Sequence, residues 1–143
     1  MLRDSFTVEL VLRHPSRSEL SIGKALSVNP RVAFIKPNAR GALFQAILQK
    51  GNSSGKFRVA LSRVVRFLRR NGKLLRTFIY ESGSGEIVIN FWTSLKFQEG
   101  DKCFELLLAP AFCEQLSASG LGLKIQVWAK SRTKLTPKSR LTP

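Results

Sequence analysis

The sequence predicts an α+β fold, a single compact domain in which a mixed or mostly antiparallel sheet of about four strands has three to four helices packed against it. Short segments with alternating apolar residues indicate strands, and one long segment with apolar residues every three or four positions indicates a helix. The 143 residues are 43% hydrophobic, which suits one domain that buries about two thirds of its unfolded surface. We assign the domain to residues 1–129.

Four segments predict the strands, near residues 6–12, 42–48, 86–92 and 121–128. In the first and third, apolar residues alternate with other residues, so one face of each strand can be buried. His14-Pro15 ends the first strand, because proline cannot donate a hydrogen bond to a neighbouring strand. Residues 31–40 predict an irregular connection broken by Pro37, and residues 103–107 predict a short additional strand.

The clearest helix is predicted at residues 57–71. At about 100° per residue, its apolar residues fall on one stripe and most of its arginines on the opposite side. The stripe consists of Phe57, Leu61, Val64, Val65 and Leu68. Asn71-Gly72 is typical of a helix C-terminus. Residues 73–80 then predict a second, shorter helix, although their β propensity leaves a strand open.

Two further helices are predicted. Ser16–Glu19 fits a capping box, which predicts a short helix that ends at Asn29-Pro30. Residues 109–119 predict a helix with Phe112 and Leu116 on its buried side. Gly120 then caps that helix.

Composition excludes several classes of protein. No apolar run approaches the ~20 residues needed to cross a bilayer. The N-terminus has Asp4 and Glu9 where a signal peptide needs an apolar block. The sequence thus predicts a cytoplasmic protein without integral membrane association, in which Cys103 and Cys113 are buried, reduced thiols. One histidine and two cysteines cannot complete a tetrahedral zinc site without carboxylates, so we expect no metal and no cofactor.

Charge is distributed very unevenly along the chain. There are 24 Lys and Arg residues against 9 Asp and Glu, a formal net charge of +15. Residues 56–76 contain eight cations and residues 130–143 contain five, and neither segment contains an acid. Residues 130–143 have little to bury and predict a basic, disordered tail. A nearly neutral domain that carries one cationic helix and one cationic tail suggests an anionic partner.

The predicted anion-binding residues lie on the cationic helix and on the segment that follows it. They are Arg58, Arg63, Arg66, Arg69, Arg70, Lys73 and Arg76. Like charges three or four residues apart cost a few tenths of a kcal/mol each, and helices usually relieve this cost with interleaved glutamates. None is present here, so either acids elsewhere in the fold, such as Asp101 or Glu114, neutralise these cations or an external anion does.

No catalytic residue is predicted. His14 is the only histidine, and its position at a strand end before proline favours a turn or capping role. The acidic pairs Glu81/Glu86 and Glu99/Asp101 flank glycine-containing turns, where we expect solvated side chains. One such pair is far short of the six to eight oxygen ligands that calcium takes.

Two parts of the sequence together resemble a known family. One is His14-Pro15-Ser16 at the end of a strand, followed by the capped helix and Asn29-Pro30. The other runs from Leu107–Phe112 through Leu116 to Gly120–Trp128. The family is the bacterial domain of unknown function 4279, which comprises small α/β proteins without an assigned activity. The resemblance spans roughly residues 6–128 and implies a fold, but it brings no catalytic residues.

Two functional hypotheses follow. The first is a noncatalytic binding module whose basic helix face engages an acidic partner, either nucleic-acid phosphates or an acidic protein; a toxin-immunity-type interaction protein would be one such case. No aromatic residues suited to base stacking are interleaved with the arginines, so nucleic-acid contacts would be nonspecific. The second is a small enzyme acting on an anionic metabolite, with His14 or a carboxylate as acid/base. The absence of a catalytic motif favours the binding module.

Overall fold

The computed structural model describes residues 5–15, 25–26, 33–38, 41–52, 56–93 and 106–129. The strands are β1 (Ser5–His14), β2 (Ala33–Asn38), β3 (Gly41–Gly51), β4 (Ser84–Thr93) and β5 (Gly122–Ala129), and the helices are α2 (Phe57–Tyr80) and α3 (Pro110–Ser119). The strands form one sheet in the order β2-β3-β1-β4-β5. β4 and β5 are parallel, whereas the other neighbouring pairs are antiparallel. The predicted α+β class with a mixed sheet is thus confirmed, and all four predicted strands are present.

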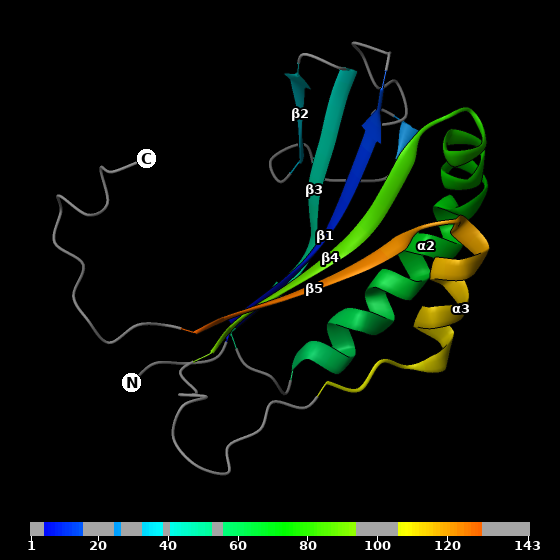
Figure 1. Cartoon of the computed structure of the whole chain (residues 1–143). Helices are drawn as coiled ribbons and strands as arrows, with labels where there is room; N and C mark the ends of the chain where they lie inside the picture. The colour runs from blue at the N-terminus through cyan, green and yellow to red at the C-terminus, as the bar shows by residue number, and fades with distance from the viewer. Residues whose placement is uncertain are drawn as a thin grey trace, which may run out of the picture.

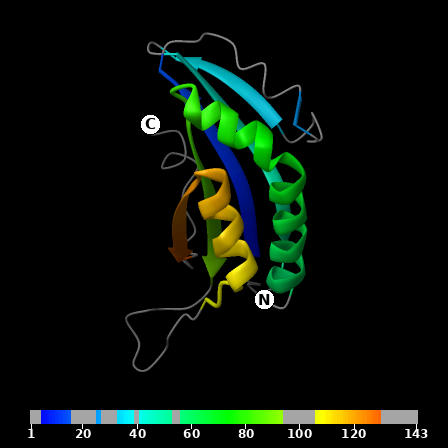
Figure 2. The same ribbon diagram turned by 90° about the vertical axis from the view of Figure 1, so that its right-hand side faces the viewer.

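α2 and α3 lie on the same face of the sheet, side by side (Figures 1 and 2). In the described part of the chain no helix covers the opposite face, which we call the open face. β1 lies at the centre of the sheet, and its successive side chains point alternately toward the helices and toward the open face. Its helix-facing residues Phe6, Val8, Leu10 and Leu12 are at most 2% exposed. This alternation is the pattern on which the first predicted strand was based.

The structure corrects the prediction that the long helix ends at Asn71-Gly72. α2 continues to Tyr80 as one helix and bends near its middle (Figures 1 and 2). Asn71 is buried, and its side-chain Nδ2 donates a hydrogen bond to the Phe67 carbonyl oxygen, 2.9 Å away, within the same helix. Leu75 and Phe78 extend the buried stripe beyond Gly72. Their burial outweighs the roughly 1 kcal/mol that a glycine costs inside a helix.

Two helices, α2 and α3, have both ends within the described part of the chain, against the three to four helices that were predicted. One reason is that residues 57–80 form one helix instead of two. The helix predicted after the capping box at Ser16–Glu19 lies outside the described residues, except for positions 25–26. The predicted tail, residues 130–143, also lies outside them.

The structure places β2 where an irregular connection was predicted. β2 pairs with β3 from Ala33↔Ala46 to Asn38↔Gly41. It contains Pro37, but it is an edge strand, and proline is tolerated there because one side of the strand has no partner to receive a hydrogen bond. Of the short strand predicted at residues 103–107, the described positions 106–107 have no regular structure.

The core lies between the sheet and the two helices. Phe6 of β1, Phe57 of α2 and Phe91 of β4 pack together, with ring centroids 5.0–6.2 Å apart. Phe112 and Leu116 of α3 are buried, as predicted, and Gly120 ends α3 at a φ of 72°. Figure 2 shows α3 lying between α2 and the β5 side of the sheet. The aromatic cluster thus connects the first turn of α2 to the ends of β1 and β4.

The prediction of a buried thiol is wrong for Cys113. Its side chain is exposed on α3, because the buried positions of that helix are taken by Phe112 and Leu116. Cys103 lies outside the described residues.

Candidate functional site

All seven predicted anion-binding side chains are exposed and share one side of α2. Positions 58, 63, 66, 69, 70, 73 and 76 are each exposed. At about 100° per residue they fall within an arc of about 140°, opposite the buried stripe of the helix. α2 has 24 residues, so this arc follows an axis of about 36 Å at about 1.5 Å per residue. We call these seven side chains the basic face.

Carboxylates do not neutralise the basic face within the described part of the chain. There, none of its seven cations forms an ion pair, and the ion pair that does occur joins Arg13 to Glu86 on the open face at 3.2 Å. Glu114 is exposed on α3 and pairs with no cation among the described residues. Asp101, the other predicted neutralising acid, lies outside them. The repulsion expected from the sequence therefore remains unrelieved by any described carboxylate.

The first turn of α2 adds to this positive charge. Its N-cap residue, Lys56, makes no side-chain capping hydrogen bond, and the first turn contains no acidic residue. Arg58 lies in this turn, although a cation at the positive end of the helix dipole is unfavourable. An anion bound near this end would offset both the missing side-chain cap and the unfavourable position of the Arg58 charge.

Sequence reasoning missed Tyr80 as a possible part of this surface. Its side chain is 91% exposed and, at about 100° per residue, falls within the arc of the basic face. Continuing the helical spacing of residues 57–71 to residue 80 would have placed Tyr80 on this side of the helix. The sequence analysis ended the helix at Asn71-Gly72 and so did not make this assignment.

A second group of polar side chains lies on the open face around a buried carboxylate. Glu9 is 8% exposed. Its Oε2 accepts hydrogen bonds from Thr7 Oγ1 at 2.9 Å and Asn90 Nδ2 at 2.8 Å, and its Oε1 accepts one from Gln45. Asn90 Oδ1 in turn accepts a hydrogen bond from Trp128 Nε1 at 3.1 Å. This network connects β1, β3, β4 and β5, and its members are too far apart in the sequence to have been predicted.

We expect Glu9→Ala to lower the free energy of unfolding by about 1–3 kcal/mol, because it leaves partly or fully buried donors without their acceptor. Urea denaturation followed by circular dichroism measures this change. Glu86→Ala is the matched control, since it removes a carboxylate from a half-exposed ion pair and should cost less than about 1 kcal/mol. Equal losses of unfolding free energy in the two variants would show that the hydrogen bonds to Glu9 stabilise the fold no more than the half-exposed ion pair does.

His14 is the last residue of β1. It is buried at the end of β1, and its Nε2 lies 3.1 Å from the Glu81 carbonyl oxygen. Its ring packs against Phe78, with the centroids 6.1 Å apart. The described contacts thus place His14 where β1 meets the C-terminal end of α2.

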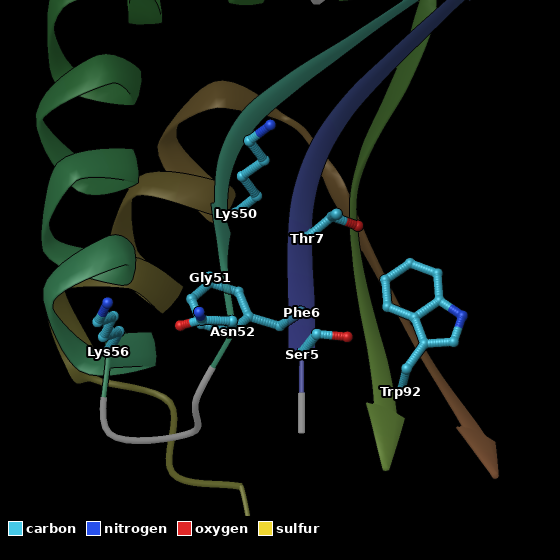
Figure 3. Close-up of a pocket in the computed structure, with 8 residues that line it drawn as sticks. All are labelled: Ser5, Phe6, Thr7, Lys50, Gly51, Asn52, Lys56 and Trp92. Atoms are coloured by element: carbon cyan, nitrogen blue, oxygen red, sulfur yellow. The ribbon is translucent and has the colours of Figure 1, made fainter. Parts of the chain in front are cut away.

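Two pockets lie near the sheet. The larger, of about 490 Å³, is shown in Figure 3 and is lined by Ser5, Phe6, Thr7, Lys50, Gly51, Asn52, Lys56 and Trp92. The smaller, of about 180 Å³, lies on the open face and is lined by Glu9, Val11, Arg13, Leu43, Gln45, Glu86, Val88, Asn90, Lys124 and Gln126. Neither pocket is lined by a residue of the basic face or by His14. The enzyme hypothesis requires a pocket in which a titratable group meets the arginines of the basic face. Neither of these two pockets meets that requirement.

Within the described ranges, no helix is both long and apolar enough to cross a membrane. Three or more His, Cys, Asp or Glu side chains that could hold a metal ion do not come together anywhere in the same ranges. Comparison of the chain with family models, curated proteins and solved structures gave no match. The family resemblance inferred from the sequence therefore stays a prediction.

Proposed function

We propose that this protein is a noncatalytic binding module whose basic face binds the phosphate backbone of a nucleic acid. The observation that carries this proposal is the set of seven exposed cations on one side of α2, none of which pairs with a carboxylate in the described part of the chain. Such a surface attracts polyanions and gains free energy by releasing their condensed counterions.

The chemistry of the basic face favours phosphates over the carboxylates of an acidic protein. Six of the seven side chains are arginines, whose planar guanidinium groups bind phosphate oxygens through two parallel hydrogen bonds. The cations extend over nearly the whole length of the helix, which suits a polymer with evenly spaced charges. Tyr80 offers an exposed ring, against which an unpaired base can stack.

The same surface argues against sequence-specific recognition. Arginines that contact phosphates position a nucleic acid but do not read its bases. The basic face presents no amide side chain, since Asn71 is buried on the other side of α2. We therefore propose binding that depends on the density of phosphates and on salt, but little on sequence.

Fluorescence anisotropy with a labelled 20-nucleotide single-stranded DNA tests the proposal. If four of the seven cations neutralise phosphates, the slope of log K against log salt concentration should be about −2.8, and affinity should fall about 50-fold between 50 and 200 mM NaCl. A slope near zero would contradict phosphate binding. Tighter binding of polyglutamate than of DNA at the same salt concentration would instead support an acidic protein as the partner.

A further inference from the structure

The larger pocket lies at the end of the sheet, next to the first turn of α2. Its volume of about 490 Å³ falls within the range of about 300–1,000 Å³ that is common for small-ligand sites. Figure 3 shows the lining residues, which come from β1, β3 and β4, from the turn after β3 and from the start of α2. It is separate from the buried carboxylate of the open face, although Thr7 belongs to both places.

The strand register determines which side chains of this pocket share a face. Thr7 pairs with Lys50 across β1 and β3, and Ser5 pairs with Trp92 across β1 and β4. Paired residues of antiparallel strands point to the same side of a sheet, and Ser5 and Thr7 are two positions apart on β1, so all four lie on the open face. Lys50 and Trp92 are separated by β1, which sets their strands about 10 Å apart.

The lining of the pocket combines positive charge with one large aromatic ring. Lys50 and Lys56 are exposed, and neither forms an ion pair with a described carboxylate. Among the described residues, no carboxylate lines the pocket, and the adjacent first turn of α2 contains none either. Figure 3 shows the two lysines on one side of β1 and the half-buried Trp92 on the other. A ligand that contacts both the lysines and the Trp92 ring needs an anionic end and a flat aromatic end.

Two contacts hold this end of the sheet in place without a ligand. A Cβ atom built at Gly51 would lie 2.5 Å from Phe6 Cε1, so only glycine leaves room there for the Phe6 ring. Thr7 Oγ1 donates to the buried Glu9 carboxylate, which orients the Thr7 side chain. The strand end is therefore preorganised.

We propose that this pocket binds one nucleotide, with its base against Trp92 and its phosphate on the other side of β1, attracted by the charges of Lys50 and Lys56. The nucleotide is either free or an unpaired nucleotide of a strand held on the basic face, and only the second source rests on the proposed function. Lys56 precedes Arg58 by two residues, so a strand that follows the basic face toward the start of α2 arrives at the pocket.

Tryptophan fluorescence tests this proposal directly. The chain has two tryptophans, so Trp128→Phe leaves Trp92 as the only reporter. Titration of this variant with adenosine monophosphate should quench its fluorescence to saturation. Adenosine and inorganic phosphate should each bind at least about tenfold more weakly, because each offers only one of the two ends.

Removal of the two lysine charges should weaken the binding of adenosine monophosphate. We expect Lys50→Gln with Lys56→Gln, in the Trp128→Phe background, to raise Kd about tenfold, which equals about 1.4 kcal/mol. Lys124→Gln is the matched control, since Lys124 lies on the open face but does not line this pocket. Its Kd should change less than twofold. An equal rise in Kd for the Lys50/Lys56 double variant and for Lys124→Gln would overturn the proposed phosphate position.

Two probes distinguish the sources of the nucleotide and separate this inference from the proposed function. Quenching by adenosine monophosphate supports a free nucleotide, whether or not the 20-nucleotide DNA binds. Quenching by the DNA alone, with saturation at the concentration where anisotropy saturates, supports a nucleotide of a bound strand. If the DNA binds by anisotropy but neither probe quenches Trp92, the pocket inference is overturned and the proposed function stands. If neither probe binds in either assay, both are overturned.

Discussion

Replacing Arg66 and Arg70 together by glutamate is expected to lower the affinity for single-stranded DNA about 100-fold at 50 mM NaCl, or about 2.7 kcal/mol. Both side chains are exposed near the middle of the basic face, so a strand bound toward either end of α2 would still contact them. The change removes two phosphate contacts and adds two repelling carboxylates. The slope of log K against log salt concentration should also become shallower by at least about 1.4, at about 0.7 per phosphate.

A matched control separates a binding surface from a general effect of net charge. Lys138→Glu with Arg140→Glu changes the net charge by the same amount within residues 130–143. We expect this control to weaken binding less than about fivefold, because residues 130–143 are predicted to add only nonspecific attraction, which salt screens. Similar losses in the two double variants would contradict a specific basic face. Circular dichroism should show that the Arg66/Arg70 variant keeps its helix content, since both side chains are exposed.

The second large effect concerns the core that supports the pocket and the start of α2. Phe6→Ala is expected to lower the free energy of unfolding by about 3–5 kcal/mol. Phe6 is 2% exposed and packs edge-on against Phe57 at 5.3 Å and close to Phe91 at 6.2 Å. Its loss removes the contact by which β1 holds the first turn of α2. Chemical denaturation with urea, followed by circular dichroism, measures the change.

Tyr80→Ala is the control for this prediction, because it removes an aromatic ring that is 91% exposed. It should change the free energy of unfolding by less than about 0.5 kcal/mol. If Phe6→Ala does not fold, Phe6→Leu preserves most of the volume and should cost about 1–1.5 kcal/mol. A loss in Phe6→Leu no larger than that in Tyr80→Ala would contradict the role of the aromatic cluster.

The parts of the fold that the sequence predicted correctly depend on local patterns. The alternation of Phe6, Val8, Leu10 and Leu12 identified the buried side of β1. Phe112, Leu116 and Gly120 identified α3 and its end, because helical spacing and a left-handed glycine are both visible over a few residues. The exposure of the five arginines between residues 58 and 70 was predicted in the same way, from their position relative to the apolar stripe.

The errors arose where contacts with other elements of the fold outweigh local signals. Asn71-Gly72 has the composition of a helix end, but burial of Leu75 and Phe78 against the rest of the fold continues α2 through it. β2 contains a proline, but pairing with β3 makes it a strand at the edge of the sheet. In both cases the deciding contact is made with another element of the fold, which a local pattern does not describe, although β3 begins only three residues after β2 ends.

The sequence by itself therefore determined that this protein has an amphipathic helix with five arginines on one side, because helical periodicity alone assigns each side chain to a face. Tertiary packing continues that helix to Tyr80 and so adds Lys73 and Arg76 to the same side. Only the tertiary structure decided that described carboxylates leave those cations unpaired, and that Lys50, Lys56 and Trp92 line one pocket. The physical reason is strand order: β1 lies between β3 and β4, and this pairing brings together residues more than 35 positions apart. Periodicity describes one segment at a time, whereas a binding site is made where several segments meet.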